Sequence, residues 1–371
     1  MNDSMTSPVH SLNAPIGITM GDPAGIGPEI VLKLLTGHGE SSRGKEDTYS
    51  ESTGSGDAKR LAQCVVYGDA GALRRTAARL GIDCHIETID HAQVAGRITS
   101  PSPSAESVPE VPVIRVIQTY QVPETLVIGK VSKQAGRSAY ESVSRAIDDA
   151  LAGHIRAMVT APLNKVSIGL AGIEFPGHTE ILAARSGDVP VAMMLANPVL
   201  RVILVTIHVP LRDVPDLISV QAELQTIEMA ALACRQLGIA RPRIAVAGLN
   251  PHAGENGKFG DEEQQVIEPA IQAARERGWD VSGPWPGDTI FARARQGEFD
   301  IVVAQYHDQG LIPVKYLGLD EGVNVTVGLP FVRTSVDHGT AFDIAGKGIA
   351  SPESLRSALN MADQLSRNAM I

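Results

Sequence analysis

Short apolar runs that alternate with longer amphipathic stretches constrain the fold of this chain most strongly. Runs such as "CVVYG" (64–68) and "DIVVAQ" (300–305) are apolar almost throughout and have the length of a strand. Helical spacing of apolar residues follows at 138–153, 219–238 and 261–278, and the last two segments end on glycine, as helices often do. Strands without a polar face lie in parallel sheets that helices cover on both sides. The sequence therefore predicts an α/β fold with a largely parallel sheet.

Bulk properties exclude several classes of protein. At 371 residues the chain has room for two domains, and its formal charge of −10 disfavours a nucleic-acid-binding protein, which needs a basic surface. No apolar run approaches the roughly 18 residues of a membrane span, and the polar N-terminus does not have the pattern of a secretory signal. Three scattered cysteines without a CxxC motif fit a reducing compartment. We expect a cytoplasmic protein without nucleic-acid or membrane partners.

Three segments read as additions to the α/β pattern. Residues 1–11 have the composition of a disordered tail, and residues 38–60 form a polar insertion with almost no large apolar side chains. Residues 99–112 are rich in Ser and Pro, which predicts a loop or linker.

Three predicted strands lead directly to a histidine. "RVILVTIH" ends on His208, "RIAVAGLNPH" on His252 and "DIVVAQYH" on His307. Because the carboxyl ends of the strands form the ligand crevice in open α/β sheets, these imidazoles can converge although they are far apart in sequence. Three imidazoles with open positions make a site for a divalent metal.

The pattern leaves a second interpretation open for each of these residues. A single histidine after a strand is more often a hydrogen-bonded loop residue than a metal ligand. Asp308 can lie beside a metal ligand, orient an imidazole or be a turn carboxylate. His178, in "FPGHTE", follows a Pro-Gly turn and precedes a short helical stretch.

Cations and glycines follow the last of these histidines. Lys315, Asn324 and Arg333 lie in an otherwise apolar region, where they suit a phosphate or carboxylate or, alternatively, are ordinary surface residues. "HGTAFDIAGKG" (338–348) offers small residues and backbone amides that let a nucleotide approach. The pattern of residues 17–35, "GITMGDPAGIGPEIVLKLL", predicts a strand, a turn and a helix. It contains no complete GxGxxG or P-loop motif, so it supports neither a Rossmann nor a P-loop nucleotide site.

Several motifs in order resemble the 4-hydroxythreonine-4-phosphate dehydrogenase family of pyridoxal phosphate biosynthesis. The resemblance covers nearly the whole chain, and more distantly it extends to isopropylmalate and isocitrate dehydrogenases. It implies two α/β/α domains with a central cleft: residues 12–140 with 330–371 on the cofactor side, and 141–329 with the metal and the dimer interface. The motifs are "ITMGDPAGIGPEI", "TAPLNK", "FPGHTEILA", "GLNPHAGENGKFGDEE", "YHDQGLIPVKYLG" and "GVNVTVGLPFVRTSVDHGTAFDIAGKG".

The resemblance also implies roles for individual residues. It implies a homodimer with the active site at the interface, where one of the three metal histidines comes from the partner subunit. The divalent ion (Zn, Mg, Co or similar) would be bound by His208, His252 and His307. The substrate would be bound by His178, Thr179, Lys315, Asn324 and Arg333. NAD or NADP would be bound by Gly339, Thr340, Ala341 and Asp343. Asp308 and Lys165 are the candidates for the proton acceptor.

The implied reaction is the NAD(P)-dependent oxidation of a secondary alcohol. The metal stabilises the developing alkoxide while hydride passes to the nicotinamide. On 4-phosphohydroxy-L-threonine, oxidation at C3 gives a 3-oxo acid that decarboxylates to 3-amino-2-oxopropyl phosphate. The alternative is a catabolic branch that converts 4-phospho-D-threonate or D-erythronate to dihydroxyacetone phosphate. The presence of His178 and Arg333 favours a phosphorylated substrate over the dihydrodiols of a third branch.

Two other classes of function use parts of the same residue set. A metal-dependent phosphohydrolase also combines histidines with cations, but it needs no nucleotide loop. A non-catalytic binding protein for nucleotides or sugar phosphates would tolerate the loss of the histidines.

Overall fold

The computed structural model describes residues 11–38, 60–90, 93–94, 111–318 and 321–368. The predicted tail and both predicted insertions lie almost entirely outside these ranges. The described residues form two compact units, each built on six strands. Unit 1 comprises the described residues up to Val189 together with Leu329–Ser366, and unit 2 comprises Pro190–Gly328.

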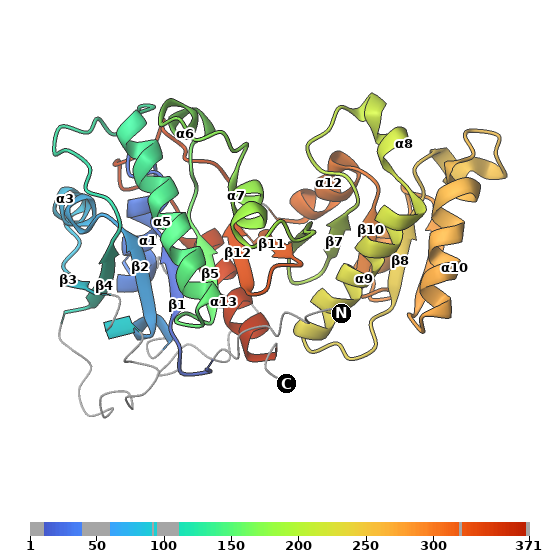
Figure 1. Ribbon diagram of the computed structural model, residues 1–371, viewed down its shortest axis with the longest axis horizontal. Coiled ribbons are helices and arrows are strands. Elements are labelled where there is room, and N and C mark those ends of the chain that lie inside the picture. The colour runs from blue at the N-terminus through green and yellow to red at the C-terminus, as the bar shows by residue number, and fades with distance from the viewer. Residues whose placement is uncertain (1–10, 39–59, 91–92, 95–110, 319–320, 369–371) are drawn as a thin grey trace. The chain divides into compact units, whose positions relative to one another are not determined.

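Unit 1 is built on six parallel strands in the order β3-β4-β2-β1-β5-β12. Helix α5 lies in front of β1, β2 and β5 in Figure 1, and α6 and α7 pack against it. The strands are β1 Ile16–Thr19, β2 Cys64–Gly68, β3 His85–Ile89, β4 Val113–Gln118, β5 Ala157–Thr160 and β12 Val332–Val336. The helices are α1 Gly27–Thr36, α3 Ala70–Leu80, α5 Lys133–Leu151, α6 Lys165–Leu170, α7 His178–Arg185 and α13 Glu353–Asn368.

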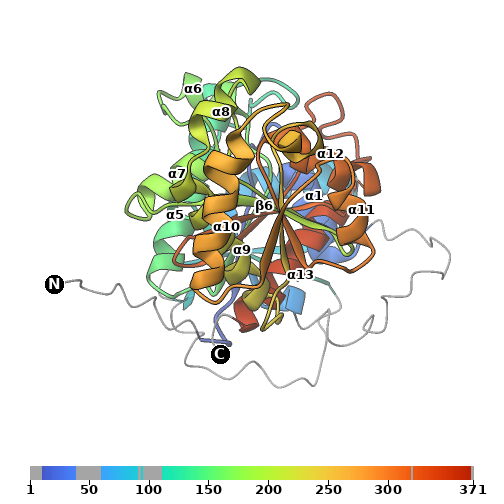
Figure 2. The same ribbon diagram turned by 90° about the vertical axis from the view of Figure 1, so that its right-hand side faces the viewer.

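Unit 2 has six strands in the order β11-β6-β7-β10-β8-β9, and only β6 runs antiparallel to its neighbours. Figure 2 shows α9 and α10 on one side of this fan of strands, and α11 and α12 on the other. The strands are β6 Ala192–Ala196, β7 Arg201–Leu204, β8 Ile244–Ala247, β9 Val281–Trp285, β10 Ile301–Ala304 and β11 Val323–Val327. The helices are η1 Leu211–Asp213, α8 Val214–Leu217, α9 Val220–Gln236, η2 Pro251–Glu255, η3 Glu263–Ile267, α10 Glu268–Glu276, α11 Ile290–Arg295 and α12 His307–Leu317.

The predicted α/β class and largely parallel sheet are confirmed. The apolar runs are strands because both of their faces are covered: every residue of β2, β8 and β10 is buried. Gly238 and Gly278, which follow two of the predicted helices, have the left-handed φ values of 91° and 87° that suit glycine. None of the helices in the described ranges combines the length and the apolar character that crossing a membrane requires.

The compact units divide the chain differently from the domain limits suggested by the sequence. Residues 141–189, expected in the second domain, belong to unit 1. The reason is packing: Val143 and Ile147 of α5 join Tyr67 of β2 and Met158 of β5 in one buried apolar cluster. Helix α5 therefore packs against the strands of unit 1.

Candidate active site

Two of the three predicted metal histidines lie together in unit 2. The ring centroids of His208 and His307 are 5.7 Å apart. His307 is the first residue of α12 and follows soon after the buried strand β10, which ends at Ala304. Its Nδ1 lies 2.7 Å from Oδ1 of Asp308. When Nδ1–H donates to this carboxylate, the lone pair of Nε2 is available to a metal.

The third histidine, His252, lies in an unusual turn of the same unit. Residues 252–256 all have positive φ, including 55° at His252 and 51° at Ala253, although only Gly254 is a glycine. The buried carboxylate of Glu263 holds the start of this turn, because it accepts hydrogen bonds from N (2.7 Å) and Nδ2 (2.9 Å) of Asn250. The ring of His252 lies 6.2 Å from that of Phe259.

The described part of the chain contains no group of three His, Cys, Asp or Glu side chains close enough to hold a metal. One chain thus brings together two of the three predicted ligands. The two remaining predicted residues of unit 2 are Lys315, later in α12, and Asn324 in β11. Oδ1 of Asn324 is buried without a hydrogen-bond partner among the described residues, which makes it an acceptor that a ligand could satisfy.

Unit 1 holds the other predicted substrate residues. Arg333 lies in β12 and is only 2% exposed, and its Nη2 donates to Oγ1 of Thr160 at 2.6 Å. Burial lowers the pKa of Arg333 to about 9, an effect that Glu180 opposes, so the guanidinium is still charged at neutral pH.

His178 begins α7, with Thr179 next to it, and its Nε2 is buried without a hydrogen-bond partner in the described structure. Burial lowers the pKa of His178 well below 6.5, and the positive charges of Arg333 and Lys165 lower it further. The imidazole is therefore neutral, and it presents an unsatisfied nitrogen beside two cations. This combination suits an anion that also carries hydroxyl groups.

Sequence reasoning missed three residues of this region. Thr160 binds Arg333, and the negative charge of Glu180 raises the pKa of the same guanidinium. Asp22 is fully buried after β1, where burial raises its pKa to about 6 and Oδ2 has no hydrogen-bond partner in the described ranges. A signal existed for Thr160 and Asp22, since each follows or ends an apolar strand just as the histidines do.

The glycine-rich segment 338–350 follows β12 in unit 1. Gly339 has open space around the position of a side chain, Thr340 is buried, and Asp343 is exposed. Ala341 has a φ of 43°, a conformation that costs a residue with a side chain about 1 kcal/mol or more. The segment thus combines accessible backbone at Gly339, an exposed carboxylate and a strained turn.

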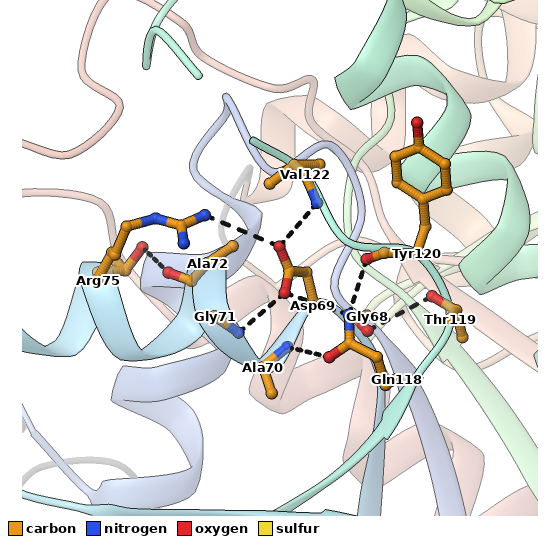
Figure 3. Close-up of polar contacts among 11 residues, drawn as sticks. Gly68, Asp69, Ala70, Gly71, Ala72, Arg75, Gln118, Thr119, Tyr120 and Val122 are labelled. Atoms are coloured by element: carbon orange, nitrogen blue, oxygen red, sulfur yellow. Dashed lines mark hydrogen bonds and ion pairs between the residues drawn. The ribbon is translucent and has the colours of Figure 1, made fainter. Parts of the chain in front are cut away.

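A second loop, between β4 and α5, is fixed at its start by Asp69 (Figure 3). Asp69 follows β2 and caps α3 by accepting from N of Gly71 at 2.8 Å. It also accepts from N of Val122 at 3.0 Å and from Nε2 of Gln118 at 3.2 Å. This carboxylate ties the ends of β2 and β4 to the loop.

Comparisons with a family model, with relatives of known name and with solved structures all find the same family of proteins. The family model for the pyridoxal phosphate biosynthetic protein PdxA matches residues 60–362. A 4-hydroxythreonine-4-phosphate dehydrogenase of Beijerinckia indica is 47% identical over 95% of this chain and 96% of its own length. A D-threonate 4-phosphate dehydrogenase of Salmonella typhimurium is 45% identical over 94% and 98%. The crystal structure of 4-hydroxythreonine-4-phosphate dehydrogenase from Klebsiella pneumoniae has a TM-score of 0.78 and 42% identity, and the match covers 95% of this chain and 99% of that one.

Proposed function

The chain belongs to the pyridoxal phosphate biosynthetic protein PdxA family and is a 4-hydroxythreonine-4-phosphate dehydrogenase-type oxidoreductase; from this membership we propose its substrate, cofactors and assembly. The substrate is a hydroxy acid with a phosphate at C4, oxidised at C3. The first candidate is 4-phosphohydroxy-L-threonine, whose 3-oxo acid loses CO₂ to give 3-amino-2-oxopropyl phosphate. The second is 4-phospho-D-threonate or the erythronate, which gives dihydroxyacetone phosphate. Relatives named for the biosynthetic and the threonate substrate are almost equally similar, at 47% and 45% identity.

A divalent metal is proposed on His208, His252 and His307. The pairing of His208 with His307, and the carboxylate of Asp308 on Nδ1 of His307, are the observations that carry this assignment. Such a carboxylate fixes the tautomer and raises the basicity of a ligating imidazole. A cation held there, whether Zn, Mg, Co or similar, would act as a Lewis acid that eases loss of the alcohol proton.

A homodimer is proposed because one chain brings only two of these histidines together. In this assembly His252 of one subunit completes the site of the other. Exposed apolar side chains in unit 2 support such an interface: Tyr316 is 91% exposed and Ile312 63% exposed on one face of α12, and Leu211 of η1 is 65% exposed.

Substrate binding is assigned to His178, Thr179, Arg333, Lys315 and Asn324. The buried guanidinium of Arg333 and the unsatisfied Nε2 of His178 suit the phosphate, because a planar fork and a neutral donor both bind its oxygens. Lys315 adds a further positive charge, and the buried Oδ1 of Asn324 accepts from a hydroxyl or amine.

The nucleotide is proposed to bind along Gly339, Thr340, Ala341 and Asp343. Bound there, NAD(P) would supply the hydride acceptor that the name dehydrogenase implies. Gly339 leaves room for close approach, and the exposed carboxylate of Asp343 suits the ribose hydroxyls of NAD better than the 2′-phosphate of NADP. NAD is therefore the preferred form.

Two side chains are candidates for accepting the proton of the alcohol. Asp308 is exposed and already bound to His307, so its first task is to hold that imidazole. Lys165 begins α6, close enough to His178 for its charge to lower the pKa of the imidazole.

One assay tests the proposal and separates its alternatives. The purified protein is incubated with NAD and either 4-phosphohydroxy-L-threonine or 4-phospho-D-threonate, with and without a chelator. We expect NADH to form with one of these substrates and to stop forming when the metal is removed. Release of inorganic phosphate without NADH would instead establish a phosphohydrolase and overturn the proposal.

A further inference from the structure

A buried ion pair on α1 is unrelated to the residues assigned above. Nζ of Lys33 lies 2.9 Å from Oε1 of Glu29 one helical turn away, and the two side chains are 8% and 1% exposed. Burying two charges costs several kcal/mol per ion unless further hydrogen bonds satisfy both groups. The partners of this pair therefore indicate what it is for.

Both charges bind the backbone of one short segment. Lys33 Nζ donates to the carbonyl oxygens of Gly348 (2.9 Å) and Ala350 (2.7 Å). Glu29 accepts from the N–H groups of the same two residues, at 3.2 Å for Gly348 and 2.8 Å for Ala350. Four hydrogen bonds thus fix the position and the direction of the backbone at the end of the segment 338–350.

The turn that precedes α1 holds the start of the same segment. N of Ile26 donates to the carbonyl oxygen of Thr340 at 3.0 Å. Gly25 packs so closely here that an added Cβ would lie 2.9 Å from that oxygen, so only glycine fits. The motif "GDPAGIGPEIVLK" (21–33) therefore contacts the glycine-rich segment near both of its ends.

A third contact reaches the middle of the segment. Gly129, whose N donates to the carbonyl oxygen of Ala24 at 2.7 Å, packs so that an added Cβ would lie 2.7 Å from the carbonyl oxygen of Phe342. The strained Ala341 lies between these contacts. A strained backbone persists only where its surroundings over-determine it.

We propose that Glu29 and Lys33 are positioning residues for the nucleotide, because they hold the segment 338–350 in its binding conformation before NAD(P) arrives. This inference rests on the proposed nucleotide site. A preorganised loop binds more tightly because the ordering cost has already been met in the free protein. We call the contacts of Glu29 and Lys33 with Gly348 and Ala350 the clamp. Loss of these contacts should weaken nucleotide binding more than it impairs catalysis by the bound complex.

The test is calorimetric titration of NAD, with the Michaelis constants measured alongside. Lys33→Met keeps the aliphatic stem and removes three hydrogen-bond donations. We expect the Kd and KM for NAD to rise about tenfold, which corresponds to about 1.4 kcal/mol, while the KM for the phosphorylated substrate and kcat at saturating NAD change little. Glu29→Gln keeps the size of the side chain and one acceptor, so a smaller rise is expected. If Lys33→Met does not fold, the Kd of the Glu29→Gln variant for NAD decides whether the clamp contributes to nucleotide binding.

Tyr67→Phe is the matched control. It removes a buried hydrogen bond of 2.8 Å to Asp149 in the same unit, so it should lower thermal stability and leave the Kd for NAD unchanged. A folded Lys33→Met protein with the wild-type Kd for NAD would overturn the clamp.

Asp343→Ala separates this failure from failure of the proposed nucleotide site. If Asp343→Ala weakens NAD binding and the clamp variants do not, the clamp alone is wrong. If Asp343→Ala has no effect on NAD binding, the nucleotide site itself is misassigned.

Discussion

A buried glutamate in unit 2 gives a sharp prediction about stability. Glu223, on α9, is completely buried beside Gln305, and neither of its carboxylate oxygens has a hydrogen-bond partner among the described residues. Burial raises the pKa of Glu223 to about 8, although the contact with Gln305 lowers it somewhat. At neutral pH the side chain is thus mostly a carboxylic acid. Gln305 is itself held in place, since its Nε2 donates to the carbonyl oxygen of Ala247 at 2.9 Å.

The sign of the pH dependence follows from proton linkage. The pKa in the folded state lies above the ordinary value of 4.5, so the folded protein binds more protons than the unfolded chain between these two values. Stability should therefore fall as the pH rises from about 4.5 to about 8. At about 1.36 kcal/mol per pH unit, the full penalty above pH 8 is on the order of 5 kcal/mol.

The variant Glu223→Gln removes this penalty, since its amide has nearly the same shape and does not ionise. The free energy of unfolding, from urea titrations followed by tryptophan fluorescence, should differ by about 1 kcal/mol or less from wild type near pH 5, where Glu223 is protonated in the folded protein. Near pH 9 the variant should be more stable by several kcal/mol. Both tryptophans, Trp279 and Trp285, lie in unit 2 with Glu223, so the signal reports the relevant unit.

The control is Glu228→Gln on the same helix, where the carboxylate is partly exposed and paired with Arg277. A surface pair of this kind is worth about 1 kcal/mol or less at either pH. Should Glu223→Gln change the free energy of unfolding equally near pH 5 and pH 9, Glu223 does not ionise in the way described.

Three further predictions concern the site. Asp308→Ala should weaken metal binding about 10- to 100-fold, measured by titration with Zn²⁺, because His307 loses the carboxylate that orients it; an unchanged metal Kd would refute this role. Arg333→Met should raise the KM for the phosphorylated substrate about 10-fold or more and leave the Kd for NAD unaltered; equal effects on both ligands would point to general damage instead. Glu263→Gln should lower the free energy of unfolding by about 1–3 kcal/mol, since one oxygen that accepts from Asn250 is replaced by a donor; unchanged urea unfolding would show that the turn at His252 does not depend on this carboxylate.

The α/β class could be predicted because burial on both faces of a strand leaves a direct trace in the sequence. The apolar run 300–305 indicated a strand, and the helical spacing and terminal glycine of 219–238 indicated a helix. No comparable signal marked the π-helical turn Glu263–Ile267 at the start of the helix predicted for 261–278. The side chain of Glu263, its first residue, accepts hydrogen bonds from Asn250, which lies outside the local pattern.

The site could be predicted only in part, for related reasons. His208 and His307 follow neighbouring strands, so the order of the sheet brings them together. His252 follows a strand as well, but the run of left-handed residues around it has no signature in residue spacing. The clamp of Glu29 and Lys33 on Gly348 links residues from opposite ends of the chain, and spacing within one segment gives no sign of it.

The claim that two subunits share one metal site can be tested directly by mixing inactive variants. His252→Ala and His307→Ala should each be inactive in NAD reduction. If these two histidines of a site come from different subunits, exchange of subunits creates hybrid dimers with one intact site each, and an equal mixture should regain about one quarter of the wild-type activity. The His252→Ala/His307→Ala double variant, mixed with either single variant, should regain none. Failure of the two single variants to restore any activity after exchange would contradict the shared site.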